Sequence, residues 1–192
     1  MTLGELQAWI LSTIKRPEKA AEVVYAINAA IEKASTQGDY AWDLVEGSIS
    51  LDATVYAQSI AISSSFQRFR KLKYLRPSGY KKVLQWKDPS RIFDKGIETV
   101  DCWYRAGDNI IFKLCHLQSS ARYAYYAYPT RLTAAGHTNN YTVQMPTVLH
   151  DLACARLYED MGNEAEAGRL ERRALRDLAA MRADRQDGVA HS

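Results

Sequence analysis

The sequence predicts an α+β fold, in which N-terminal and C-terminal helices form a bundle and a small antiparallel β insertion is segregated from it. Apolar residues recur at helical spacing at both ends of the 192-residue chain. Between about residues 42 and 128 the chain is instead rich in Val, Ile, Tyr, Thr and Ser, with turn signals between short runs. We therefore expect a single domain over 1–192, made of helices over 1–38, a mainly β insertion over 39–130, a C-terminal helical hairpin over 145–186 and a flexible tail over 187–192.

The N-terminal segment predicts two helices. Thr2 and Glu5 have the spacing of a capping box. One face of the first helix then carries Leu3, Leu6, Ile10 and Ile14. Pro17 is placed to open a second helix over about 18–35, which Gly38 ends. The apolar line of that second helix is Ala20, Val24, Ile27, Ile31 and Ala34.

The middle of the chain predicts a series of short strands. The segment 106–109, Ala-Gly-Asp-Asn, is a hairpin turn between two of them. Asp88-Pro89 and Gly96 indicate a short helical turn between those two points. The candidate strands are 48–51, 59–65, 68–75, 100–105, 110–114 and 121–128.

The C-terminal third predicts a helical hairpin. Pro146 opens the first helix, and Gly162-Asn163 ends it and caps the second. The polar stretch 184–192, which contains Gly188, is expected to fray from the second helix. The apolar positions are Leu149, Leu152, Ala153 and Leu157 in the first helix, and Ala167, Leu170, Ala174, Leu178 and Met181 in the second.

Composition excludes several classes of protein. No run approaches the ~18 apolar residues of a membrane span, and the N-terminus lacks the basic lead of a signal peptide. The cysteines, Cys102, Cys115 and Cys154, form no C-x-x-C pair, which favours buried apolar roles over a disulfide framework or a zinc site. The net charge of +3 is unevenly distributed. Ten bases face two acids over 68–95, whereas eight acids face four bases over 1–52, a pattern suited to stacking against copies of itself or another charged partner.

Nothing in the sequence has the spacing of a catalytic or metal-binding motif. The phosphate-binding glycine loops, the nucleophile elbow and H-E-x-x-H are absent from the sequence. His150 and Cys154 are one helical turn apart, but an exposed histidine beside a buried core cysteine is the more common arrangement. We expect no catalytic residue, no metal and no cofactor.

Two local clusters are candidates for an interface with another subunit or partner. In a strand over 66–74, Arg68 and Arg70 point to one side and Phe69 to the other, so the strand buries one face and presents cations on the other. The alternative is a solvated edge strand protected by its charges. Adjacent tyrosines in the last strand cannot share one face without a bulge, which favours an oligomer contact for some of the rings. The candidate residues are Arg68, Arg70, Lys71, Lys73, Tyr123, Tyr125, Tyr126 and Tyr128.

Several short segments resemble one known family. The second helix contains 24–32, VYAINAAIE, and is followed by 38–42, GDYAW, and 45–51, VEGSISL. The segment 86–96 ends in Phe-Asp-Lys-Gly, and Gly162-Asn163 separates an alanine-rich helix from the last one. These segments and the order of the elements resemble the head-to-tail adaptor proteins of tailed bacteriophages, of the tail tubular protein A type.

The resemblance implies a structural virion protein of the phage neck, assembled in the host cytoplasm. Its copies would form a ring, usually a dodecamer, that joins the portal protein to the tail or nozzle protein and continues the DNA channel for genome ejection. It implies non-specific proximity to packaged DNA and no membrane. The acidic and basic segments are candidates for the two unlike faces of a ring contact. Lys81, Lys82 and Lys87 are candidates for contact with the DNA channel or an acidic partner, and Arg176, Arg182 and Arg185 for docking on the portal, where the C-terminal tail would become ordered.

Three alternative functions remain open. A tail terminator or another head–tail joining protein would have the same kind of surfaces and differ only in its partner. A nucleic-acid-binding regulator would use the basic segment 68–95 and bind DNA with steep salt dependence. A hydrolase would need a site gathered from residues distant in the sequence.

Overall fold

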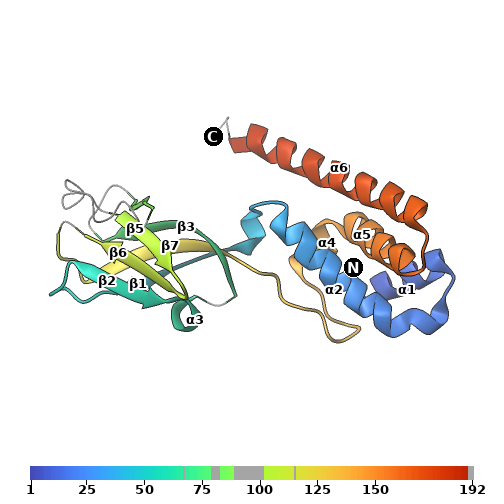
Figure 1. Ribbon diagram of the computed structural model, residues 1–192, viewed down its shortest axis with the longest axis horizontal. Helices are drawn as coiled ribbons and strands as arrows, with labels where there is room; N and C mark the ends of the chain where they lie inside the picture. The colour runs from blue at the N-terminus through green and yellow to red at the C-terminus, as the bar shows by residue number, and fades with distance from the viewer. Residues whose placement is uncertain (67, 79–82, 89–101, 115, 190–192) are drawn as a thin grey trace. The chain divides into compact units, whose positions relative to one another are not determined.

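The computed structural model describes residues 1–66, 68–78, 83–88, 102–114 and 116–189 (Figure 1). The chain divides into two compact units. One consists of Met1–Trp42 and Pro129–Ser192 and is called the helical unit below; the other is Asp43–Tyr128 and is called the β unit. All strands of the described residues lie between Leu44 and Ala127, and the longer helices lie on either side of them in sequence. The predicted α+β class with a segregated sheet region is confirmed.

The described part of the helical unit contains five α-helices and a short 3-10 turn, and a second 3-10 turn, Ala41–Asp43, leads from it into the β unit. Its first part contains α1 (Leu3–Ile14), the turn at Pro17–Lys19 and α2 (Ala20–Thr36). Its second part contains α4 (Asn140–Gln144), which the sequence reading missed, α5 (Pro146–Asp160) and α6 (Glu164–Val189). The predicted Thr2 capping box is present, and Pro146 is at the start of α5 as expected.

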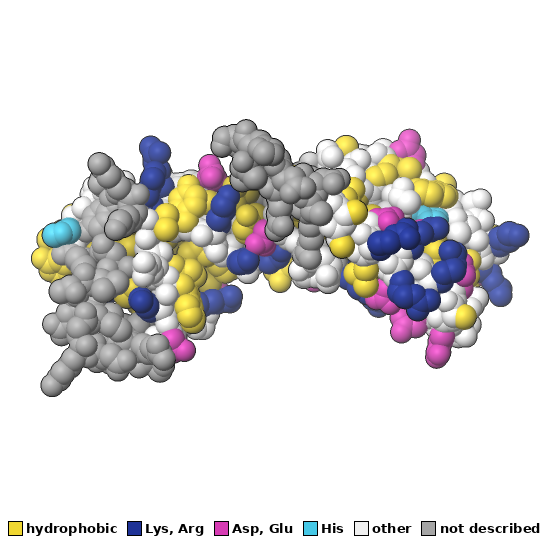
Figure 2. All heavy atoms as spheres, turned by 90° about the horizontal axis from the view of Figure 1, so that it is seen from above, with side chains coloured by type: hydrophobic (Ala, Val, Ile, Leu, Met, Phe, Trp, Pro, Cys, Tyr) yellow, Lys and Arg dark blue, Asp and Glu magenta, His cyan; other side chains and the backbone are white. Residues whose placement is uncertain are grey.

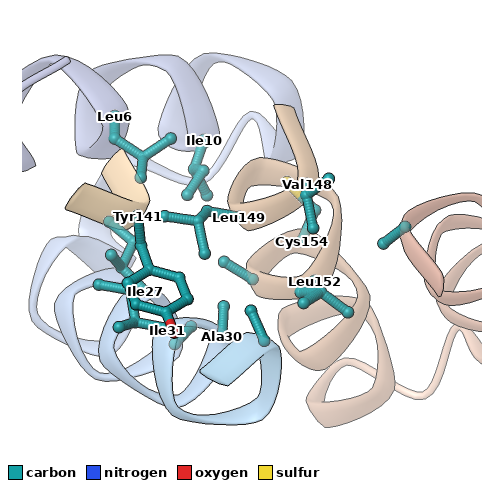
Figure 3. Close-up of a cluster of buried hydrophobic side chains, with 14 of the residues drawn as sticks. Leu6, Ile10, Ile27, Ala30, Ile31, Tyr141, Val148, Leu149, Leu152 and Cys154 are labelled. Carbon is teal, nitrogen blue, oxygen red and sulfur yellow. The ribbon is translucent and has the colours of Figure 1, made fainter. Parts of the chain in front are cut away.

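The core of the helical unit follows the predicted apolar periodicity closely. The predicted face of α1, Leu3, Leu6, Ile10 and Ile14, is buried. On α2 three of the five predicted residues, Ile27, Ile31 and Ala34, are buried, whereas at the start of the helix Val23 is buried and Val24 only partly so. Figure 3 shows Leu149 of α5 among side chains of α1 and α2, with Tyr141 of α4 beside them. The unit therefore has one continuous aliphatic core shared by its helices.

A long connection, 129–139, is tied to the first two helices by backbone groups. The amides of Leu3 and Gly4, which have no partner within α1, donate to the carbonyls of His137 and Ala135 at 2.8 Å each. The Asn28 side chain donates from Nδ2 to the Leu132 carbonyl and accepts from the Leu132 amide, both at 2.9 Å. The Asn28 side chain thus supplies this loop with one donor and one acceptor, as a neighbouring strand would do.

The β unit consists of two small sheets that share a core. In one sheet the order is β1 (Leu44–Ser50), β7 (Ser120–Ala127) and β3 (Phe69–Pro77), and all pairs are antiparallel. In the other the order is β2 (Ala57–Ala61), β6 (Asn109–Lys113), β5 (Cys102–Ala106) and β4 (Gln85–Trp86). The predicted turn joins β5 to β6, with Ala106 opposite Asn109 and Gly107 at φ 57°. The residues buried between the sheets include Ile60, Leu72, Phe112, Leu114 and Tyr125.

The structure departs from the sequence prediction at several element boundaries. The strand expected over 59–65 ends at Ala61 and continues as a helical turn, α3 (Ile62–Ser65), because three consecutive serines favour local bonding over a ladder. The two-residue strand β4 was not predicted, and it pairs with β5 in parallel. The last helix continues to Val189 instead of fraying from 184, since no proline interrupts it. Most of the helical turn expected near 88–96 lies outside the described residues.

Candidate interaction surfaces

Two bulges in β3 determine which of its side chains face outward. The residues of β3 that oppose β7 are Phe69, Lys71, Leu72, Tyr74 and Leu75, and the register shifts between Phe69 and Lys71 and again between Leu72 and Tyr74. At each shift two residues of β3 oppose one residue of β7, so both members of the pair point to the same side. A regular strand would have alternated sides at every residue.

The consequence is that the basic side chains of β3 lie on one side of the sheet. Leu72 and Leu75 are buried in the core of the β unit, whereas Lys71 and Lys73 are exposed and Arg76 is half-buried. The prediction that Arg68 and Arg70 point to the same side of a regular strand is therefore wrong, because the strand is not regular. Arg68 has a φ of 50° and its Nε donates to the Tyr128 carbonyl at 2.9 Å, which fixes it at the start of the strand.

Strand β7 adds another base to this side. Arg122 is exposed and lies directly opposite Arg76 in the β3–β7 register. Like charges directly opposite each other on one face destabilise a sheet. Glu46 of β1 contributes one carboxylate to the same side, because it opposes Ala124 while Ser48 opposes Arg122. We call Lys71, Lys73, Arg76 and Arg122 the cationic face.

Arg70 belongs to the interior of the subunit and not to its exposed surface. Its Nη2 is 3.5 Å from Oδ2 of Asp43, and the two side chains are 9% and 4% exposed. Its guanidinium lies over the Tyr126 ring, 5.5 Å from the centroid. Breaking such a buried pair leaves an uncompensated charge, so Arg70 is a structural residue here.

The four tyrosines of the predicted cluster have different environments. Tyr125 is a core residue whose ring meets Phe66 edge-on at 5.2 Å. Tyr126 is buried on the opposite side of β7, beneath Arg70. Tyr123 is half-buried and also meets the Phe66 ring, whereas Tyr128 is 37% exposed. Adjacent rings do face opposite sides, as expected, but both sides are covered within the chain, which leaves Tyr128 as the exposed ring of the four.

The other predicted contact residues are only partly described. Lys87 is half-buried, and its amide donates to the Trp103 carbonyl at 3.0 Å. Lys81 and Lys82 lie outside the described residues. Arg176 is exposed beside Asp177, while the side chains of Arg182 and Arg185 are likewise outside what the structure describes. All three positions belong to α6. Figure 2 shows several Lys and Arg side chains gathered on the face of the helical unit seen there, with Asp and Glu side chains beside them.

The helical unit carries a group of acids at the turn between its last two helices. Glu159 and Asp160 end α5, and Glu164 begins α6. All three are exposed, and none is ion-paired within the described part of the chain. Carboxylates at a helix C-terminus oppose the helix dipole, and the last turn of α5 has no base. We call Glu159, Asp160 and Glu164 the acidic tip.

The acids of the N-terminal segment are arranged differently. Glu18 lies 3.5 Å from Arg16, Glu22 lies 3.5 Å from Lys19, and Glu32 lies 3.8 Å from Arg131. Each of these three carboxylates has a base within 4 Å, so they do not form an unpaired acidic surface. The unpaired acids are instead concentrated at the acidic tip, which was not predicted from the sequence.

A shallow groove opens beside the acidic tip. Its volume is about 390 Å³, and it lies between α2, α5 and α6. Small residues such as Ala26, Ala30 and Ala155 line it together with Glu159 and Glu164. Arg156 also lines this groove and is the base nearest to the tip in sequence. The groove can hold the aliphatic stem of a long side chain whose charged end reaches the carboxylates.

His150 is buried, contrary to the prediction that it would be exposed. Its ring stacks on Trp9 with centroids 4.0 Å apart, Nε2 is 2.9 Å from Oγ1 of Thr13, and Nδ1 is 3.1 Å from Oδ1 of Asp151. Asp151 is also bound by the guanidinium of Arg173 through two hydrogen bonds. This network joins α1, α5 and α6 across the helical unit.

Cys154 lies in this network but is unsuited to nucleophilic chemistry. Its Sγ is 3.6 Å from Nε2 of His150, which resembles a catalytic pair. However, the side chain is fully buried, and burial, with the nearby Asp151 carboxylate, raises the pKa of the thiol to about 12. A nucleophilic cysteine requires the thiolate, so the arrangement is structural. Among the described residues no group of His, Cys, Asp and Glu could hold a metal ion, and no helix is long and apolar enough to cross a membrane.

Comparison with known proteins identifies the family. No curated protein matches the chain. A family model described as "SU10 adaptor protein" matches residues 1–191. This family implies a structural phage protein of the virion that associates with portal and tail proteins. The chain therefore belongs to the SU10 adaptor protein family and is a phage adaptor protein.

Proposed function

We propose that this adaptor forms a closed ring of identical subunits that joins the portal to the tail and continues the DNA channel. The observation that carries the proposal is the presence of two unlike charged surfaces on one chain, the cationic face in the β unit and the acidic tip in the helical unit. A ring contact is heterologous, so each subunit must present two different and complementary surfaces. The number of copies, a dodecamer, follows only from the resemblance of the sequence to connector proteins.

The C-terminal helix is the proposed attachment to the portal. α6 has 26 residues against 15 in α5, and Met181, the last of its residues whose side chain is described, packs against the core. The helical backbone continues beyond it to Val189. Arg176, Arg182 and Arg185 lie along this helix and are the proposed docking residues. Because the backbone is helical through Val189, we propose docking of a formed helix in place of a segment that folds on binding.

Electron microscopy of the purified chain mixed with the portal protein of the same phage tests this proposal. We expect a ring of density attached to one end of the portal and coaxial with it. A chain that lacks 184–192 should form fewer such complexes, and the full chain is its matched control. Solitary subunits that bind neither the portal nor a tail protein would contradict the adaptor role.

A joining role at another level of the tail is the first alternative. Pull-down with portal protein against pull-down with tail-tube protein separates the two. The second alternative is a nucleic-acid-binding regulator, which the cationic face favours together with Lys81, Lys82 and Lys87. It predicts tight, steeply salt-dependent DNA binding by the isolated chain. In the proposed adaptor these lysines have only non-specific proximity to the packaged DNA.

A further inference from the structure

We propose that the acidic tip of one subunit binds the cationic face of its neighbour, and that this is the contact which closes the ring. The inference rests on the proposed ring and names the two surfaces that make it. Both surfaces lie on described residues of this chain, and their charges are opposite. In a ring of identical subunits the occupant of the cationic face is therefore the acidic tip of a second copy.

The bases of the cationic face repel one another, and an acidic occupant would remove this repulsion. Arg76 and Arg122 are directly opposite each other on adjacent strands, which is unfavourable within the subunit. Neither they nor Lys73 are ion-paired in the part of the chain that the structure describes. The two bulges of β3 place Lys73 on the same side of the sheet as these arginines. The backbone is thus shaped so that these charges are presented together.

Two carboxylates of the acidic tip are in an unfavourable position that a basic occupant would relieve. Glu159 and Asp160 lie at the negative end of the α5 dipole, where the helix would be more stable with bases. Glu164 follows after a three-residue turn, at the start of α6. Most other acids of the helical unit have a base within 4 Å, as Glu18, Glu22 and Glu171 do. A contact between the tip and the cationic face brings Lys73, Arg76 and Arg122 to the three carboxylates of the tip and relieves the repulsion on both sides.

The groove beside the tip gives this contact a second component. It is lined by alanines of α2 and α5 next to Glu159 and Glu164, and also by Arg156 and by Lys33, which is paired with Glu171. A lysine or arginine of the neighbour can lay its methylene stem on these alanines while its charge meets the carboxylates. The contact is then partly apolar, so salt should weaken it without abolishing it.

Charge reversal on each surface, followed by mixing, tests the inference. One variant carries Lys73→Glu with Arg122→Glu, and the other carries Glu159→Lys with Asp160→Lys. A matched control carries Lys15→Glu with Arg172→Glu, two exposed bases of the helical unit that lie on neither surface. Circular dichroism and thermal melting check that each variant folds. Self-association is measured by sedimentation velocity, alone and on the portal protein.

We expect each surface variant to associate at least ~10-fold more weakly than the wild type, and the control to associate normally. An equimolar mixture of the two surface variants should regain association, because the reversed face of one matches the reversed tip of the other. Equal association by all variants, or no recovery in the mixture, would overturn the inference. If the wild type forms a ring on the portal and both surface variants do so equally well, only this inference fails. If the wild type forms no ring in either setting, the proposed function fails with it.

Carbodiimide coupling gives a second readout that does not depend on folding of a variant. It joins a lysine amine to a carboxylate in direct contact, so Lys73 should couple to Glu159, Asp160 or Glu164. In a mixture of isotopically light and heavy chains, the coupled peptides should combine both labels. Coupling only within one label would contradict a contact between subunits. Loss of duplex DNA binding in the cationic-face variant, with self-association unchanged, would assign that face to nucleic acid.

Discussion

The helical unit and the β unit each bury a small core, but the two cores are built differently. Of the described residues, 24 form the buried cluster of the helical unit and 12 that of the β unit. The larger cluster is assembled from side chains at regular helical spacing, with Ala and Ile on α2 and Ala and Leu on α5 and α6. The smaller one depends on irregular points, which are the two bulges of β3 and the glycine of the β5–β6 turn.

The two units also treat charge differently. In the helical unit the buried carboxylate of Asp151 is matched by Arg173 and His150. In the β unit Arg76 and Arg122 are held next to each other, and neither is ion-paired among the described residues, although Glu46 lies on the same side of the sheet. The first arrangement stabilises the subunit, whereas the second reduces its stability and belongs to the proposed binding surface. On that proposal, local irregularity in the β unit indicates function more directly than the regular helices do.

The largest expected effect tests the charge pair of the helical unit. Arg173→Met keeps most of the side-chain volume but leaves Asp151, whose side chain is 1% exposed, without its guanidinium. Arg173 is 40% exposed, so the pair is only half-buried, but its loss leaves the buried Asp151 carboxylate without a charge partner. We therefore expect a loss of roughly 3 kcal/mol in the free energy of unfolding, the low end for a buried pair. Chemical denaturation followed by circular dichroism measures it. Arg172→Met, which changes an exposed base of the same helix, should change stability by less than about 0.5 kcal/mol.

The same pair predicts a pH dependence. Burial alone would raise the pKa of the Asp151 carboxyl, but the hydrogen bonds from Arg173 and His150 outweigh it and hold this pKa below its ordinary value. A lowered pKa in the folded state contributes stability that is complete above the ordinary value, near pH 4, and is lost as the pH falls through the folded pKa. Acid titration of stability should show this loss in the wild type. A wild-type slope that persists in Arg173→Met would contradict the assignment.

The next effect tests close packing in the β unit. A Cβ at Gly47 would lie 2.6 Å from Oη and 2.8 Å from Cζ of Tyr123, its partner across the strands. That ring is held against Phe66 at 4.9 Å and cannot move freely. Gly47→Ala should therefore cost about 1–3 kcal/mol, measured by thermal or chemical unfolding. In a Tyr123→Leu background the same change should cost much less, and an additive result would show that the clash is not the cause.

A smaller effect tests the tie between α2 and the connection 129–139. Asn28→Ala removes both bonds to the backbone of Leu132 and should cost about 1–2 kcal/mol. Hydrogen exchange of the Leu132 amide should increase more than global stability falls, because that amide loses its acceptor. Asn28→Asp keeps an acceptor but places a carboxylate against the Leu132 carbonyl, so it should be no better than alanine. Unchanged exchange at Leu132 would contradict the role.

Much of the helical unit could be predicted from the sequence because its signals are local. The capping box at Thr2 and the apolar face of α1 depend on residues within one helix, and both are correct. The burial of His150 could not be predicted, since its partners Trp9 and Thr13 come from a helix about 140 residues away in sequence. On α2 the predicted Ile27, Ile31 and Ala34 are buried, but Val23 takes the place of Val24 at the start of the buried face, so periodicity is less exact at the end of the helix.

Less of the β unit could be predicted. The strands were found from composition, but a bulge depends on the pairing of β3 with β7, which are far apart in the chain. The cationic face was therefore foreseen as a basic segment and not as a single surface. A search for bases that break the alternation, as Arg70-Lys71 and Lys73 do, could have suggested it.

The smallest expected signal compares the two units within one molecule. Cys102 of the β unit and Cys154 of the helical unit are both buried, so each thiol reports the opening of its own unit. In a Cys115→Ser background, labelling at pH 8 should be slow at both sites. It should be slowest at Cys154, where a pKa of about 12 leaves only ~10⁻⁴ of the thiol ionised. As denaturant rises, Cys102 should become labelled first, because the smaller and more irregular core opens more readily. Labelling of Cys154 first would reverse the comparison and place the weaker packing around the His150 network.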